Sequence, residues 1–162
     1  MKKSIKLFCV ILAIVFTFSG CGSSFLGGPS KITLTPENAS DYLTFSLHGG
    51  GGDPEYTSTY GIVYNTMEAY GNISGVSGYN YDNVSITLKF SFRLTGAAGK
   101  DHGIHSITTN PIQLNVGGNG TVKESEDSYN DGTINWTLFE KEVECLGYEI
   151  VSVSGTVTPS SN

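Results

Sequence analysis

The chain has 162 residues, and its fifteen acidic residues outnumber its nine basic residues, which gives a formal net charge of −6 at pH 7. This length suits a single domain with a core of ordinary size. Beyond residue 20 the basic residues are scattered. Nucleic acid is therefore not an expected partner, because phosphate binding depends on clustered Lys and Arg.

The first twenty residues have the composition of a secretory signal. Lys2, Lys3 and Lys6 precede an uncharged, mostly apolar run from Leu7 to Phe18. This run is too short for a helix that crosses the hydrocarbon core of a membrane, which requires about 20 residues. A basic start, a short apolar run and small residues after it are typical of a signal peptide. We therefore expect residues 1–20 to be a signal.

The end of this segment, Phe18-Ser19-Gly20-Cys21, resembles the lipobox of bacterial lipoproteins. Ser19, Gly20 and Cys21 match the motif, whereas the family usually has Leu in place of Phe18. In that family the cysteine receives a diacylglyceryl group with fatty acyl chains such as palmitate, and the signal is cut before it. The resemblance implies that Cys21 is lipidated in this way. Ordinary signal cleavage near a cysteine is the alternative.

The residues after Cys21 indicate how the remaining chain is organised. Residues 21–30 are rich in Gly and Ser, which is typical of a flexible tether. We expect a domain at 31–158 and a short tail at 159–162. Six basic and fifteen acidic residues follow residue 20, so this part carries a formal charge of −9. An acidic domain held off an anionic surface fits a lipid anchor on the extracytoplasmic side of the cell membrane.

The cysteines allow no internal disulfide if this interpretation holds. Cys9 belongs to the signal and Cys21 carries the lipid, so Cys145 has no partner. We expect Cys145 to be a small buried hydrophobe. A reactive thiol is the alternative, and it would require a histidine or cationic neighbour.

Strand patterns dominate from residue 31 onward. In the clearest, from Val84 to Leu94, every second residue is apolar and the residues between are polar. An antiparallel sheet with one covered face produces this alternation. Shorter alternating segments include 32–35, 43–48, 60–64, 112–116, 134–138 and 142–158. In the last segment the alternation slips at Leu146-Gly147 and again at Ile150-Val151, which indicates a bulge or a corner.

Turn signals separate these segments, and helical periodicity is almost absent. The stretch from Thr35 to Asn38 predicts a cap and one short helical turn. We expect turns at Gly49–Pro54, Gly71–Asn83, Gly96–Gly103, Asn115–Gly120 and Asp127–Gly132. About seven or eight short strands with Gly-rich turns predict an all-β fold, an antiparallel β-sandwich of Ig-like architecture. The Cys…Trp…Cys framework of true Ig domains is missing.

Three stretches, "LTPENASDYLTFSL", "NVSITLKFSF" and "GYEIVSVSGTVT", carry a second resemblance. They are similar to a small β-sandwich domain of unknown function that recurs in extracytoplasmic proteins of Gram-positive bacteria. The likeness covers about residues 31–158. It implies a fold and a location, and it brings no catalytic residues.

Two groups of residues are weak candidates for a metal site. Asp101, His102 and His105 could approach one another in a turn, although no zinc motif accompanies them. The acidic stretch from Asp127 resembles a calcium loop, but Leu138 stands where an EF-hand requires Glu. A looser calcium site could use Glu124, Glu126, Asp127 and Asp131. In both places exposed polar side chains are the simpler interpretation, and we expect no metal and no cofactor.

Tyrosines suggest where a ligand could bind. They concentrate at Tyr56, Tyr60, Tyr64, Tyr70, Tyr79 and Tyr81. A tyrosine combines a flat apolar face with a hydroxyl, which suits sugar and peptide surfaces. We select Tyr79 and Tyr81, expected in a loop, and Tyr56 as candidate ligand contacts. Packing of Tyr60 and Tyr64 at a sheet edge is the alternative for those two residues.

Three interpretations of function follow, and the sequence leaves them open. The first is a non-enzymatic surface lipoprotein that binds a ligand or serves the envelope, because no catalytic constellation stands out. The second is a carbohydrate-binding or adhesion module that uses residues 56–81. The third is a small metal-dependent extracytoplasmic enzyme that uses His102 and His105. We favour the first, with a glycan or a protein as the undefined ligand.

Overall fold

The computed structural model describes residues 30–59, 61–96, 99, 101–127 and 140–160. These residues form eight β-strands and one four-residue helix. The elements in chain order are β1 (Ile32–Thr33), α1 (Ala39–Tyr42), β2 (Leu43–Thr57), β3 (Gly61–Gly75), β4 (Tyr79–Gly96), β5 (Asp101–Thr108), β6 (Ile112–Gln113), β7 (Gly120–Asp127) and β8 (Glu140–Pro159).

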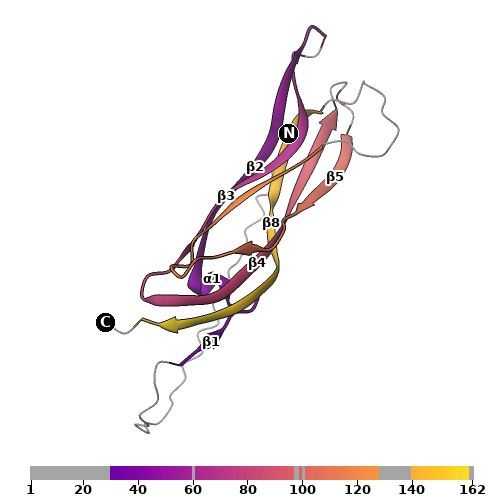
Figure 1. Ribbon diagram of the computed structural model, residues 1–162. Coiled ribbons are helices and arrows are strands. Elements are labelled where there is room, and N and C mark those ends of the chain that lie inside the picture. Colours follow the sequence, from indigo (N-terminus) through magenta and orange to yellow (C-terminus); the bar gives the residue numbers. More distant parts are fainter. Residues whose placement is uncertain (1–29, 60, 97–98, 100, 128–139, 161–162) are drawn as a thin grey trace, which may run out of the picture.

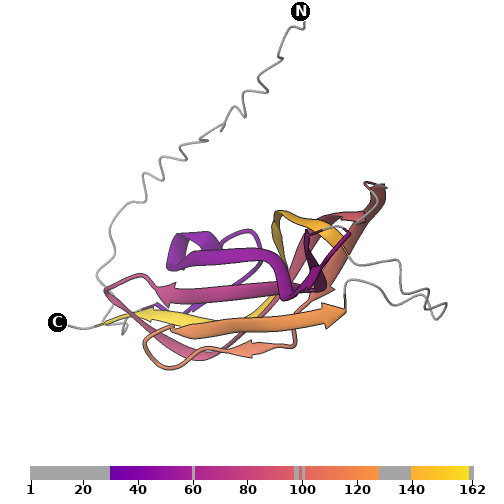
Figure 2. The same cartoon turned by 90° about the horizontal axis from the view of Figure 1, so that it is seen from above.

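The strands form two antiparallel layers that pack face to face (Figure 1 and Figure 2). The first layer has β3 in the middle, paired with β2 on one side and β7 on the other. The second layer pairs β8 with β1 and β4, and β4 pairs further with β5 and β6. The layers are joined where Tyr64 of β3 pairs with Glu140 of β8. This arrangement confirms the predicted all-β sandwich.

Strand β4 supplies the largest part of the core. Its alternating apolar residues are all at most 1% exposed, whereas the residues between them are only partly buried or exposed. Burying one such large side chain stabilises a fold by about 1.5–3 kcal/mol. The alternation predicted from the sequence is therefore confirmed, and it fixes which face of β4 points inward. The buried residues are Val84, Ile86, Leu88, Phe90, Phe92 and Leu94.

Strand β8 contains the two irregularities that its sequence predicts. The register opposite β4 shifts between Ser91 and Phe92 and between Thr87 and Leu88. Leu146 and Val151 are the extra residues at these shifts, and both side chains are exposed. A bulge inserts a residue that has no partner and redirects its side chain. The slips in the apolar pattern thus correspond to real bulges.

The predicted turn at Gly49–Pro54 is wrong, because these residues lie within β2. A Cβ on Gly49 would lie 2.8 Å from Cys145 Sγ and 2.9 Å from Phe92 Cε1, and a Cβ on Gly51 would lie 2.4 Å from Tyr64 Cγ. Glycine is required here because neighbouring side chains occupy the space that its own side chain would need. Cys145 itself is half-buried against the core, so it is less buried than expected.

The predicted turn at Gly71–Asn83 is also wrong over most of its length. Strand β3 continues to Gly75 and β4 begins at Tyr79, so only three residues connect them. Gly71 has φ +143°, and a Cβ there would lie 2.2 Å from the Ser46 carbonyl oxygen. This glycine therefore marks a close approach of β2 and β3 rather than a chain reversal.

Other local predictions differ in outcome. The turn at Asn115–Gly120 is confirmed, and the Asn115 side-chain oxygen accepts hydrogen bonds from the backbone of Gly117 and Asn119. The helical turn begins at Ala39, a few residues later than expected. The predicted turn at Gly96–Gly103 is shorter than expected, because β5 already begins at Asp101. The predicted strand at 134–138 and most of the turn at 127–132 lie outside the described residues.

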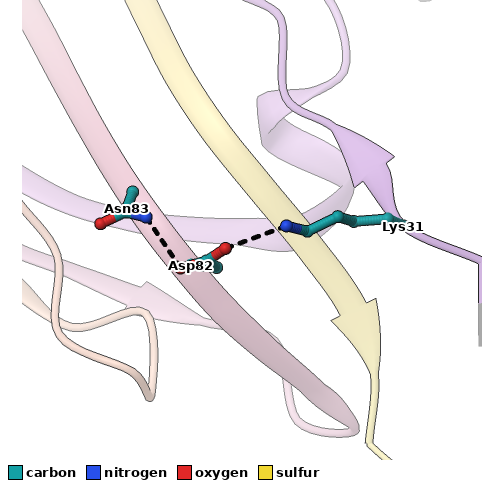
Figure 3. Close-up of polar contacts among 3 residues, drawn as sticks. All are labelled: Lys31, Asp82 and Asn83. Atoms are coloured by element: carbon teal, nitrogen blue, oxygen red, sulfur yellow. Dashed lines mark hydrogen bonds and ion pairs between the residues drawn. The ribbon is translucent and has the colours of Figure 1, made fainter.

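The chain enters the sandwich at one end of its long axis. Ile32 of β1 pairs with Val157 near the end of β8, whereas the β2–β3 turn lies at the opposite end of the molecule (Figure 1). Lys31 Nζ lies 3.0 Å from Asp82 Oδ2, and the Asn83 side-chain amide donates to the other oxygen of Asp82 (Figure 3). This exposed ion pair contributes little to stability, because solvent screens it.

Candidate ligand-binding face

The outer surface of the first layer gathers polar and aromatic side chains in rows across three strands. Cross-strand partners in an antiparallel sheet point to the same side. His48 of β2, Tyr70 of β3 and Lys123 of β7 form the central row. The neighbouring rows are Ser46, Asn72 and Thr121 on one side, and Gly50, Glu68 and Ser125 on the other. We call this surface the Tyr70 face.

An open groove of about 520 Å³ runs along β3 and β7 on the Tyr70 face. Ala69 and Val122 also border the groove, but their side chains are buried in the core. These two residues therefore border the groove with their backbone atoms only. The groove itself lies on the outer surface of the first layer. Its side-chain lining includes Glu68, Tyr70, Asn72, Thr121, Lys123 and Ser125.

Tyr70 is the aromatic centre of the groove. Its side chain is 48% exposed, and its ring centroid lies 5.8 Å from that of His48 with an angle of 33° between the planes. The ring is thus tilted against that of His48 and leaves about half of its surface open to solvent.

Glycines in β2 shape the side of this face next to Glu68. The position of a Cβ on Gly52 lies 2.1 Å from a carboxylate oxygen of Glu68, so the Glu68 side chain occupies that space. At Gly50, the cross-strand partner of Glu68, a Cβ would have no atom within 4 Å. The lack of a side chain at Gly52 thus makes room for the Glu68 carboxylate, and the lack of one at Gly50 leaves the surface beside Glu68 open.

Hydrogen-bonding groups lie along the groove on both sides of Tyr70. Thr121 Oγ1 is 3.5 Å from Asn72 Oδ1, which forms a hydroxyl and amide pair at one end. Glu124 also borders the groove, but it is the cross-strand partner of the buried Ala69, so its side chain points to the other side of the sheet, where it accepts a hydrogen bond from the backbone of Asn110, 3.1 Å away. Hydroxyl, amide, carboxylate and ammonium groups together can both donate to and accept from a ligand that carries hydroxyls.

The predicted loop pair Tyr79 and Tyr81 is wrong, because both residues lie on β4. Tyr81 is only 4% exposed, and its hydroxyl proton is shared between the carbonyl oxygens of Tyr42, at 2.5 Å, and Val76, at 3.1 Å. Burial raises the pKa of Tyr81. Tyr79 packs edge-on against Tyr42, with ring centroids 5.2 Å apart. Tyr81 is therefore a structural residue that a surface ligand cannot reach.

The remaining candidate tyrosines lie outside the groove. Tyr56 is 78% exposed near the β2–β3 turn, where it pairs with Ile62. Tyr64 is half-buried, and its ring covers Gly51. Tyr60 lies outside the described residues. Tyr56 is thus accessible, but it is separate from the groove.

Asp101, His102 and His105 lie on β5, so the prediction that they lie in a turn is wrong. Asp101 accepts a hydrogen bond from the Gly103 backbone at 2.8 Å, and His105 Nε2 lies 3.1 Å from the His102 carbonyl oxygen. The His102 ring lies 2.6 Å from the position that a Cβ on Gly96 would occupy. Local backbone contacts therefore hold the side chains of Asp101 and His105, and the His102 ring covers Gly96.

Of the four acidic candidates, the structure describes the side chains of Glu124 and Glu126 only. Glu124 and Glu126 are both on β7, and Glu124 bonds to the Asn110 backbone. Asp131 and the side chain of Asp127 lie outside the described residues. Within the described part of the chain, no group of three or more His, Cys, Asp or Glu side chains could hold a metal ion.

The lipidation candidate Cys21 lies outside the described residues, as does the whole predicted signal. In the part of the chain that the structure describes, no helix has the length and apolar character needed to cross a membrane. No family model, curated protein or solved structure matches the chain. The candidate face therefore rests on its own geometry.

Tyr70 belongs to the Tyr-rich segment 56–81 but was not selected as a ligand contact, and Asn72 and Lys123 were not predicted to lie beside it. Glu68, Tyr70 and Asn72 do alternate with Ala69 and other small or apolar residues, which was a usable signal for one strand face. The partner strand was not predictable in the same way. Only the register of β7 against β3 shows that Lys123 lies opposite Tyr70.

Proposed function

We propose that this protein is a lipid-anchored extracytoplasmic binding module without enzymatic activity, and that it takes its ligand on the Tyr70 face. The observation that carries the proposal is the groove along β3 and β7, in which a half-exposed tyrosine stands among groups that form hydrogen bonds. Concave sites with apolar surface and a few placed polar groups are the usual ligand sites of proteins.

The anchor in this proposal comes from the N-terminal sequence. A short apolar run ends in Ser19-Gly20-Cys21, which resembles a lipobox. Two acyl chains on Cys21 would hold the protein stably at a membrane, where a single chain is marginal. Because β1 enters at one end of the sandwich, the β2–β3 turn would lie at the end of the domain farthest from the anchored segment (Figure 1).

Lipidation is tested by metabolic labelling of the full chain with an alkyne-tagged palmitate in a bacterium that processes lipoproteins. We expect the wild type and Cys145→Ser to take up label and Cys21→Ser to take up none. Cys145→Ser is the matched control, because it also removes one thiol. An unlabelled wild-type protein would contradict the anchor.

The ligand face is tested by placing a photo-cross-linking amino acid at position 125 of the full chain, in cells, because Ser125 lines the groove beside Glu68 and Tyr70 stays in place. Position 151 is the control, because Val151 is also an exposed strand residue but lies in the other layer. We expect envelope components to be cross-linked from position 125 and not from position 151. Cross-linking from position 151 alone would contradict the proposed face.

A further inference from the structure

We infer that the ligand of the Tyr70 face is a neutral polysaccharide chain, which lies along β3 and β7 with one sugar ring stacked on Tyr70. This inference rests on the proposed ligand face and names the chemical class that the face accepts. Three features carry it: the exposed aromatic ring, the spacing of the polar groups, and the pairing of the strands beneath the groove.

The aromatic ring provides a stacking platform. A pyranose ring has one or two faces made of C–H groups, and these faces are apolar enough to lie on an aromatic surface. Tyr70 offers such a surface at 48% exposure, and His48 packs against it with ring centroids 5.8 Å apart. Because a tyrosine side chain has only two torsions to fix, stacking on this ring costs little conformational entropy.

The polar groups continue along the strands on either side of the platform. Same-face residues on a strand are about 6.7 Å apart, so Glu68, Tyr70 and Asn72 extend over about 13 Å. Thr121 and Lys123 follow the same direction on β7. Each group can bond to a hydroxyl, since carboxylates accept, ammonium groups donate and amides do both. A linear ligand with hydroxyls along its length matches this layout better than a compact ligand does.

The pairing of β3 disfavours a peptide ligand. An extended peptide binds a sheet by adding a strand to an edge, where it takes up backbone hydrogen bonds. Strand β3 already pairs with β2 on one side and β7 on the other, so its backbone groups are taken, and an added strand would have to lie beyond the outer edge of β7, away from Tyr70. A ligand that binds through ring faces and hydroxyls needs no backbone partner.

Charge disfavours an anionic polymer. Among the side chains that line the groove on this face, the carboxylate of Glu68 offsets the ammonium of Lys123, so the groove has no excess of positive charge. The chain beyond residue 20 carries a formal charge of −9, which repels acidic ligands at long range. The inference therefore specifies a neutral chain.

The test measures binding of the full chain in detergent to defined polysaccharides by affinity electrophoresis. The neutral probes are a mixed-linkage β-glucan, a xylan, a mannan and chitin oligosaccharides, and the acidic probe is polygalacturonate. We expect at least one neutral probe to bind more tightly than polygalacturonate. Tyr70→Ala should weaken that binding about tenfold, because the platform is lost.

Two further variants control the measurement. Tyr70→Phe keeps the ring and should bind within about threefold of the wild type, since stacking does not need the hydroxyl. Tyr56→Ala removes another exposed tyrosine outside the groove and should leave binding unchanged. The inference is overturned if no neutral probe binds, if the acidic probe binds best, or if Tyr70→Ala binds like the wild type.

The cross-linking experiment separates this inference from the proposed function. A carbohydrate adduct at position 125, resistant to protease and degraded by glycosidases, supports both. A protease-sensitive adduct at position 125 overturns the polysaccharide and keeps the ligand face. An adduct at position 151 alone contradicts both.

Discussion

The polar side chains are arranged differently on the outer surfaces of the two layers. On the second layer, Lys89 of β4 and Glu149 of β8 are cross-strand partners, and their charged groups lie 3.4 Å apart. Arg93 and Glu144 are also cross-strand partners, on the other side of the bulge at Leu146. On the first layer, the central row places His48 and Lys123 on either side of a half-exposed Tyr70. The second surface pairs opposite charges within the sheet, whereas the first presents an aromatic ring and hydrogen-bonding groups to solvent.

The largest expected effect is on stability, and it comes from a substitution within the first layer, where β2 and β3 approach each other closely. Gly71→Ala would place a Cβ 2.2 Å from the Ser46 carbonyl oxygen, at a φ of +143° that side chains rarely adopt. We expect the free energy of unfolding to fall by roughly 2–4 kcal/mol, as measured by urea denaturation. Gly50→Ala is the matched control, because a Cβ there meets no atom within 4 Å, and it should change stability by at most about 1 kcal/mol. Equal effects of the two substitutions would contradict this account of the β2–β3 approach.

A smaller effect concerns Tyr81, which ties β4 of the second layer to the ends of β2 and β3. Tyr81→Phe removes the hydroxyl that bonds to the Tyr42 and Val76 carbonyls, so it should cost about 1 kcal/mol at pH 7. Urea denaturation would measure this loss, and an unchanged stability would show that the bonds contribute nothing.

The same residue predicts a dependence on pH. Burial raises the pKa of Tyr81 and of Tyr148 above the ordinary value of 10.0. The unfolded chain therefore loses these protons first as the pH rises. Stability should be unaffected below about pH 9 and should decline above about pH 10. Unfolding free energies measured from pH 8 to pH 11 should show a shallower decline in Tyr81→Phe, and an equal decline would contradict the assignment.

The smallest expected effect concerns the second surface. Lys89→Gln removes the exposed ion pair with Glu149, and such pairs contribute at most about 1 kcal/mol. We expect a change of less than about 0.5 kcal/mol in unfolding free energy and unchanged polysaccharide binding. Loss of binding in this variant would show that the two surfaces do not differ in function as proposed.

The fold was predictable wherever one strand carried its own signal. Strand β4 alternates over eleven residues, from Val84 to Leu94, and the bulges at Leu146 and Val151 appear as slips in the same kind of pattern. Such signals depend only on which face of a strand is covered. The sandwich followed from several of them together.

The wrong turns and the missed site have a common cause. Glycine is a local turn signal, but Gly49 and Gly71 are glycines because another layer or strand comes close to them. Likewise, Tyr70 and Tyr81 are both strand tyrosines. Which one is buried depends on the packing of the layers, and which residues stand beside Tyr70 depends on the register of β7. Both depend on pairing and packing between strands that are far apart in the sequence, so the residues of one segment do not predict them.

One measurement tests the central claim most directly. It is the dissociation constant of the complex between the full chain and its tightest-binding neutral polysaccharide. We predict that it rises about tenfold in Tyr70→Ala and stays unchanged in Val151→Ala, which alters an exposed residue of the second layer. Equal constants for the wild type and Tyr70→Ala, in a protein that still folds, would contradict the account.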